Sequence, residues 1–154
     1  MKDFVNVGLL GAGTVGGGVL KVLEKNAEKI AKEVGKPVRI TKVLDRHVDR
    51  LKQEYGDKYI FTDNADEVLE DKDIDIIVEL LGREHPAKEF IARAFANGKH
   101  VVTANKDVLA KFGSELFPLA HEHNCDFMFE ASVCGGIPII GPLKTSMAAN
   151  QITS

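Results

Sequence analysis

Two patterns of hydrophobic and polar residues alternate along the chain. Short continuous runs of Val, Ile and Leu are typical of strands that are buried on both faces of a parallel sheet. Between them, apolar residues spaced three and four apart predict helices with one buried face. The predicted strands are 4–10, 38–44, 59–61, 74–81, 100–103 and 126–129, and the predicted helices are 14–34, 47–55, a short acidic helix capped by Asp63 or Asn64, 85–99 and 108–123.

This alternation predicts the fold class. Strands that alternate with helices pair in parallel, because each helix returns the chain, through a right-handed crossover, to the end of the sheet where the previous strand began. We therefore expect an α/β fold of the Rossmann type, a doubly wound parallel sheet with helices on both faces.

A glycine-rich stretch, GAGTVGGG (11–18), follows the first predicted strand and opens the first predicted helix. Three of its glycines have the spacing G-x-G-x-x-G. In this context the first permits a tight turn, the second lets the backbone approach a pyrophosphate, and the third lets the helix pack on the strand. The alternative is a turn that needs glycine only for close packing. The contacts predicted for a bound dinucleotide are Gly11, Gly13, Thr14, Val15 and Gly16.

Charged residues at the end of the second predicted strand complete this motif. Asp45 lies where an acidic residue binds the hydroxyl groups of the adenosine ribose, although farther along than usual because the first helix is long. Arg46 follows, and an arginine there can pair with a 2′-phosphate. Asp45 favours NAD and Arg46 favours NADP, so the predicted cofactor is NADP or NAD.

Composition changes near residue 131. Residues 131–154 contain three glycines, two prolines and no acidic residue, and no closing element follows. We expect a dinucleotide-binding domain over 1–131 and, over 132–154, the start of a substrate or dimerisation domain that is truncated at Ser154.

Charge and hydropathy reduce the range of partners. The net charge is −3, and no basic block is present of the kind that binds nucleic acid. No apolar run approaches the length of a membrane span, and the N-terminus does not resemble a signal peptide. The sequence thus predicts a cytoplasmic protein that binds neither nucleic acid nor membranes.

Segments that follow the later strands should face a dinucleotide lying across the carboxyl ends of the sheet. They are ELLGREHPA (79–87), VVTANKDVLA (101–110) and FEASVCGGIPII (129–140). With GLLGAGTVGGGVL (8–20), they resemble the N-terminal region of homoserine dehydrogenases. This chain has Arg83 where the family usually has a second glycine, and Cys134 where a small residue such as alanine is more common.

The resemblance implies roles for particular residues. Lys106 matches the family's lysine between cofactor and substrate, and its ammonium would stabilise charge that develops on a carbonyl. Thr103 is implied to contact the cofactor and to shape the turn with Asn105. The family's site for a monovalent cation, sodium, matches Glu130, Val133, Gly135 and Ile137.

The resemblance also implies an activity: interconversion of L-aspartate 4-semialdehyde and L-homoserine by hydride transfer, in threonine and methionine biosynthesis. The partners would be this small-molecule substrate and, in the longer protein, further copies of the chain in a homo-oligomer. The 154-residue chain alone should bind cofactor without turnover. The alternatives are another semialdehyde or amino-acid dehydrogenase with the same nucleotide fold, and a nucleotide-sensing module without catalysis.

Overall fold

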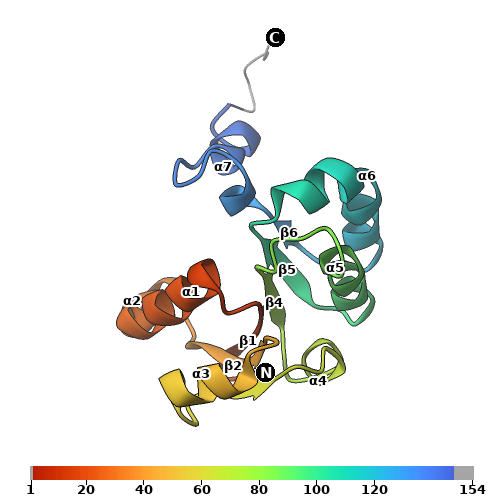
Figure 1. Ribbon diagram of the computed structural model, residues 1–154. Coiled ribbons are helices and arrows are strands. Elements are labelled where there is room, and N and C mark those ends of the chain that lie inside the picture. Colours follow the sequence, from red (N-terminus) through yellow and green to blue (C-terminus); the bar gives the residue numbers. More distant parts are fainter. Residues whose placement is uncertain (1, 148–154) are drawn as a thin grey trace.

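Six parallel strands form one sheet in the computed structural model, which describes residues 2–147. Their order is β3-β2-β1-β4-β5-β6, so the strand order reverses between β1 and β4 (Figure 1). The doubly wound α/β fold expected from the sequence is confirmed. The strands are β1 (Val5–Leu10), β2 (Val38–Leu44), β3 (Ile60–Thr62), β4 (Ile76–Glu79), β5 (His100–Thr103) and β6 (Phe127–Met128).

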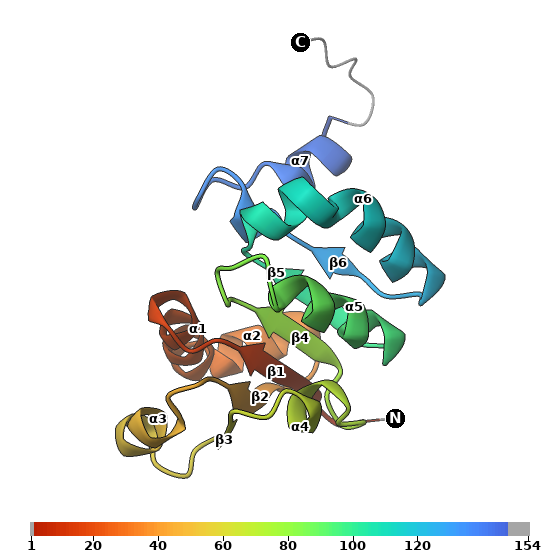
Figure 2. The ribbon, with the colours of Figure 1, turned by 45° about the vertical axis from the view of Figure 1, so that its right-hand side comes forward.

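Helices cover both faces of the sheet (Figure 2). One hydrophobic core joins the sheet to α1 and α3 through residues such as Leu9, Leu20 and Leu51, and α2 lies beside α1. A second core on the opposite face joins it to α4, α5 and α6 through residues such as Leu10 and Phe95. The helices are α1 (Thr14–Lys25), α2 (Ala27–Val34), α3 (Val48–Tyr55), α4 (Asp66–Leu69), α5 (Ala87–Ala96), α6 (Lys106–Glu122) and α7 (Ile140–Lys144).

The helix predicted over 14–34 is wrong as one element, because the structure divides it at Asn26 into α1 and α2. The Asn26 side-chain amide and its backbone N–H both donate to the carbonyl of Val22, at 2.9 and 3.0 Å. Asparagine competes in this way for backbone groups and so favours helix ends. Val22, in the last turn of α1, is exposed.

Asparagine side chains lie at or just before the start of two other helices. The Asn105 side chain accepts a hydrogen bond from the Val108 N–H at 3.2 Å, so α6 starts at Lys106, two residues earlier than predicted. The acidic helix α4 follows Asn64, whose Oδ1 accepts from the Asp66 N–H at 3.0 Å. The predicted cap at Asp63 or Asn64 is wrong, because the N-cap of α4 is Ala65 and the Asn64 side chain instead closes the turn before it.

The chain leaves the sheet after β6. A single 3₁₀ turn, η1 (Glu130–Ser132), leads to α7, which projects beyond the two layers of helices (Figures 1 and 2). The domain division at residue 131 stays a prediction, and residues 148–154 of the second part lie outside the described residues. Within residues 2–147, no helix is both long enough and apolar enough to span a bilayer.

Candidate functional site

The glycine loop connects the end of β1 to the start of α1, beside the point where the strand order reverses. Gly11 has a φ of 94°, and a Cβ atom on it would lie 2.9 Å from the carbonyl oxygen of Leu80. A Cβ atom on Gly16 would lie 2.1 Å from the carbonyl oxygen of Gly11. Both contacts are too close for a side chain, so positions 11 and 16 require glycine for the packing of the loop itself.

Gly13 differs from these two glycines. It has extended backbone angles, and no protein atom lies within 4 Å of where its Cβ atom would be. The loop therefore packs without any need for glycine at this position. A ligand that approaches the backbone would meet open space here, next to the free N–H groups of the first turn of α1.

Gly16→Ala is expected to lower the free energy of unfolding by about 1–3 kcal/mol, because the added methyl group must displace the backbone of the loop. Urea denaturation followed by circular dichroism measures this change. Gly18→Ala is the matched control, since Gly18 lies in the same helix with no atom within 4 Å of its Cβ position. If Gly16→Ala is as stable as the control, the close contact between Gly16 and the Gly11 carbonyl does not contribute to stability.

Asp45 links the glycine loop to the end of β2. Its Oδ2 accepts a hydrogen bond from the Ala12 N–H at 2.8 Å, and its Oδ1 accepts from the His47 N–H at 2.9 Å. A carboxylate has about four lone-pair sites, so two remain free for the hydroxyl groups of a ligand. Arg46 is exposed beside it.

Arg50 is a residue that the sequence did not single out. Its guanidinium reaches from α3 to the carbonyl oxygen of Ala12 at 3.4 Å, which places a second positive charge beside the loop. Arg50 and Arg46 also share a polar surface pocket with Lys52. Arg50 lies among other charged residues on an exposed helix face, so nothing in the sequence distinguishes it from an ordinary surface arginine.

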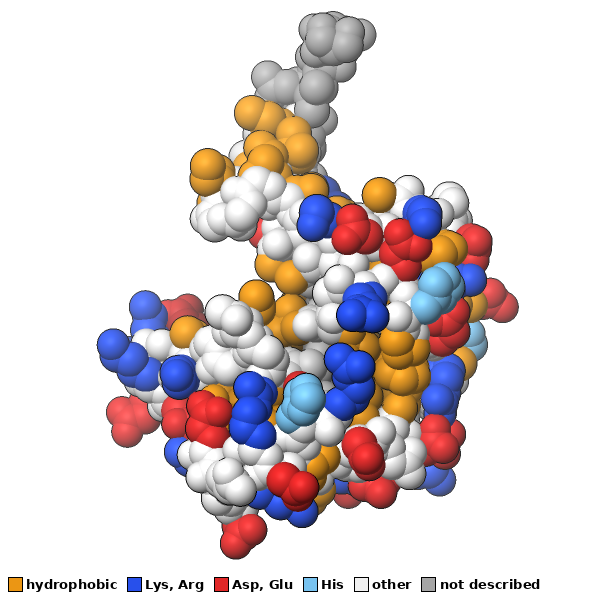
Figure 3. Space-filling model, in the orientation of Figure 1, with side chains coloured by type: hydrophobic (Ala, Val, Ile, Leu, Met, Phe, Trp, Pro, Cys, Tyr) orange, Lys and Arg blue, Asp and Glu red, His pale blue; other side chains and the backbone are white. Residues whose placement is uncertain are grey.

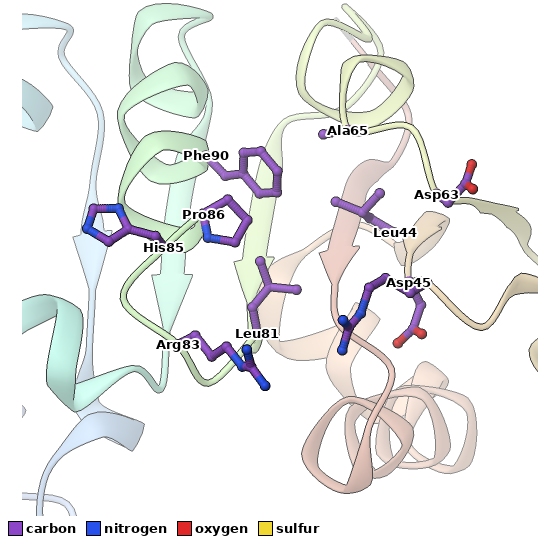
Figure 4. A pocket seen from close by; sticks show the side chains of 10 residues that line it. Leu44, Asp45, Asp63, Ala65, Leu81, Arg83, His85, Pro86 and Phe90 are labelled. Atoms are coloured by element: carbon purple, nitrogen blue, oxygen red, sulfur yellow. The ribbon is translucent and has the colours of Figure 1, made fainter.

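A pocket of about 270 Å³ lies between the end of β2 and the segment that follows β4. Figure 4 shows Leu81, Pro86 and Phe90 of the latter segment on one side and Asp45 on the other. Arg83, the residue that departs from the family pattern, lies at the same end of the pocket as Asp45. Apolar walls with charged groups at one end suit a flat aromatic group that carries polar substituents.

Lys106 is the first residue of α6 and points into solvent, with its side chain 76% exposed. Its Nζ lies 3.9 Å from the Asp107 carboxylate. The preceding turn is rigidly bonded: the Asn105 N–H donates to the Thr103 hydroxyl at 3.0 Å, and Thr103 is fully buried. The structure thus places Lys106 at the carboxyl end of β5, free to contact a bound molecule.

Glu130 binds the start of α7. Its carboxylate accepts hydrogen bonds from the N–H groups of Gly141, Ile139 and Ile140, at 2.8, 2.5 and 2.8 Å. These three bonds hold the pKa of the carboxyl below its ordinary value. Val133, Gly135 and Ile137, the other predicted cation ligands, lie in the segment between η1 and α7, where Gly135 has a left-handed φ of 57°.

A space-filling view shows a deep notch between α1 and the segment that carries α7 (Figure 3). The glycine loop, between β1 and α1, and Lys106, at the start of α6 after β5, both lie at the carboxyl ends of the strands. In a doubly wound sheet, ligands bind in the crevice outside these strand ends, where the strand order reverses.

The sequence model of a known family, "Homoserine dehydrogenase, NAD binding domain", matches residues 11–130. The chain belongs to this family. It is 47% identical over 150 residues to homoserine dehydrogenase of Neisseria gonorrhoeae and 42% identical over 149 residues to that of Bacillus subtilis. Each match covers 97% of this chain and 34% of the relative, so this homoserine dehydrogenase NAD-binding domain spans about a third of their length.

Solved structures agree with this assignment. A crystal structure of a homoserine dehydrogenase from Thiobacillus denitrificans superimposes with a TM-score of 0.91 at 46% identity, over 97% of this chain and 34% of that chain. A hyperthermophilic archaeal homoserine dehydrogenase in complex with NADPH superimposes with a TM-score of 0.75 at 27% identity, over 91% of this chain and 48% of that chain. The resemblance drawn from the four sequence segments is therefore confirmed.

Proposed function

We propose that this NAD-binding domain binds NADP or NAD across the carboxyl ends of its strands and forms the nucleotide-binding part of an enzyme that interconverts L-aspartate 4-semialdehyde and L-homoserine. The observation that carries the proposal is the glycine loop, where, of the three motif glycines, Gly11 and Gly16 are closed by packing and Gly13 is open. The archaeal relative that binds NADPH supports it. The products would enter threonine and methionine biosynthesis.

The cofactor would supply or take up a hydride at C4 of its nicotinamide ring. This chain's contribution is to bind and orient it. The free N–H groups at the start of α1 would hold the pyrophosphate, with Gly11, Gly13, Thr14, Val15 and Gly16 around it. The two unused acceptor sites of Asp45 would bind the adenosine ribose, and the pocket beside it would hold the adenine.

Lys106 and Thr103 would act at the other end of the crevice. When an aldehyde accepts a hydride at its carbon, negative charge develops on its oxygen. The Lys106 ammonium would stabilise that charge, and Thr103 would hold the turn that presents it. The group that protonates this oxygen would lie in the part of a full-length enzyme that corresponds to the other two thirds of the relatives' sequences.

The remaining expectations follow from the family. A monovalent cation, sodium, would bind Glu130, Val133, Gly135 and Ile137, and the Glu130 carboxylate would then share its oxygens between the cation and the N–H groups at the start of α7. The complete enzyme would be a cytoplasmic homo-oligomer.

Preference between the two cofactors should depend on two adjacent residues. Arg46→Ala is expected to weaken NADP by roughly 10-fold and NAD much less, because only NADP offers a 2′-phosphate for a charge-assisted hydrogen bond. Asp45→Asn should weaken NAD more than NADP. Calorimetric titration of each variant with each cofactor gives four dissociation constants, and each is compared with the wild-type value for the same cofactor. Equal losses for both cofactors would show that neither side chain reads the ribose.

Turnover tests the proposed activity. In a chimaera, residues 1–154 replace the matched third of the Neisseria gonorrhoeae enzyme, and oxidation of NADPH or NADH is followed with aspartate semialdehyde. Substrate-dependent oxidation supports the proposal. A chimaera that binds the cofactor and oxidises it only with a different aldehyde or oxo acid would instead support another dehydrogenase, and one that binds it without any turnover would support a nucleotide sensor.

A further inference from the structure

Glu79 is a fully buried carboxylate in the sheet. It is the last residue of β4, has no exposed surface, and pairs in register with Thr103, the last residue of β5. β4 is the neighbour of β1 across the reversal of strand order. A buried carboxylate is costly unless its oxygens are well bonded, so its position next to the cofactor crevice requires an explanation.

Hydrogen-bond donors from two separate segments converge on Glu79. Its Oε2 accepts from the Thr103 hydroxyl at 2.6 Å. Its Oε1 accepts from the Leu81 N–H at 2.7 Å and has a longer contact of 3.5 Å from the Asn105 side-chain amide. The same amide donates to the carbonyl oxygen of Arg83 at 2.8 Å. The loop after β4 and the turn after β5 are thus joined through one side chain.

The chemistry of these donors explains why the residue is a glutamate. An ionised carboxylate offers only acceptors, so it can satisfy all three donors at once. A glutamine has the same shape, but its amide group would turn a donor toward one of these groups. The Thr103 hydroxyl donates to Glu79, because a carboxylate has only acceptors to offer, and the hydroxyl oxygen in turn accepts from the Asn105 N–H.

We propose that Glu79 is a positioning residue for the turn that carries Lys106, fixing it to the loop after β4 at the nicotinamide end of the crevice. This proposal deepens the proposed function and rests on it. Asn105, which this network holds, also caps α6 through the Val108 N–H. The carboxylate therefore sets the start of α6, and with it the place from which the Lys106 side chain extends.

The chain contains a matched control. Glu84 also joins the two segments, by an ion pair of 2.6 Å between its carboxylate and Lys111 on α6, but both side chains are partly exposed. Exposed ion pairs contribute little to stability. Glu84→Gln therefore removes a carboxylate from the same loop without disturbing the buried network.

Hydrogen exchange in the 154-residue chain tests whether Glu79 holds the turn. In Glu79→Gln and Glu79→Leu, the amides of Asn105 and Val108 should exchange roughly 10-fold faster or more, while Glu84→Gln stays close to the wild type. If Glu79→Leu does not fold, Glu79→Gln, with the same shape, decides alone. Unchanged exchange at both amides would overturn the proposal, whether or not the chain binds a dinucleotide.

Kinetics of the chimaera tests whether the turn matters for the reaction. Glu79→Gln should lower kcat by roughly 10-fold, while affinity for ADP-ribose or its 2′-phosphate, measured by calorimetry, changes less than about 2-fold. Two results would overturn the proposal and leave Glu79 with a general structural role. In one, Glu79→Gln has the same kcat as Glu84→Gln; in the other, Glu79→Gln lowers ADP-ribose affinity by the same factor as kcat. A wild-type chimaera that binds no dinucleotide would contradict the proposed function instead, and the exchange result would still decide how the turn is held.

Discussion

Lys106→Ala is expected to lower kcat of the chimaera by roughly 100-fold or more, the scale of losing one group that stabilises charge in the transition state. Lys106 is exposed at the carboxyl end of β5, and among residues 2–147 its ammonium has only a weak contact with Asp107. Cofactor affinity should fall much less, because the pyrophosphate and ribose would bind at the glycine loop and Asp45. Steady-state kinetics together with calorimetry separates the two effects.

Two further variants sharpen this prediction. Lys106→Arg should recover little activity, because a planar guanidinium does not place its charge where a compact ammonium does. Lys111→Ala is the control: it removes an exposed lysine from the same helix, and kcat should stay near the wild type. If Lys106→Ala retains kcat and loses only cofactor affinity, Lys106 is a binding residue and the catalytic role is wrong.

Gly13→Val is expected to abolish detectable binding of NADP and NAD while the fold is retained. The backbone at Gly13 is extended and no protein atom lies within 4 Å of its Cβ position, so the protein itself tolerates a side chain. A pyrophosphate at the start of α1 would not, because valine would occupy the space through which it reaches the N–H groups. Calorimetric titration measures the loss, and thermal unfolding checks the fold.

Gly18→Val is the control for the loop, since Gly18 also has open space around its Cβ position but lies one turn farther along α1. It should bind both cofactors as the wild type does. Affinity that survives in Gly13→Val would show that the loop is not the phosphate site.

The strands could be predicted because each is a run of apolar residues flanked by helical patterns. β2 and β5 have the predicted ends: Pro37 and Asp45 flank Val38–Leu44, and Lys99 precedes His100–Thr103. The break at Asn26 could not be predicted from periodicity alone. The apolar spacing continues across it, and the break lies in the backbone of Asn26, which leaves the helical conformation while its side chain donates to the Val22 carbonyl.

The site could be predicted only where a motif carries its own physical reason. Gly11 and Gly16 have a spacing that implies a turn and a close contact, and both are present. Glu79 lies inside the run IDIIVELL, where a single acidic residue gives no sign that three donors from two segments meet on it. Arg50 was missed for a related reason, because its contact with Ala12 depends on how α3 packs.

The most direct measurement of the central claim is a titration of the ¹⁵N-labelled chain with NADP and NAD, followed by the backbone amide resonances. We expect at least one cofactor to shift the amides of residues 11–16 first and most, together with those around Asp45 and Lys106, while the outer faces of α2 and α5 stay unchanged. Saturation without shifts in the glycine loop, or shifts centred away from the carboxyl ends of the strands, would contradict a dinucleotide site in this crevice.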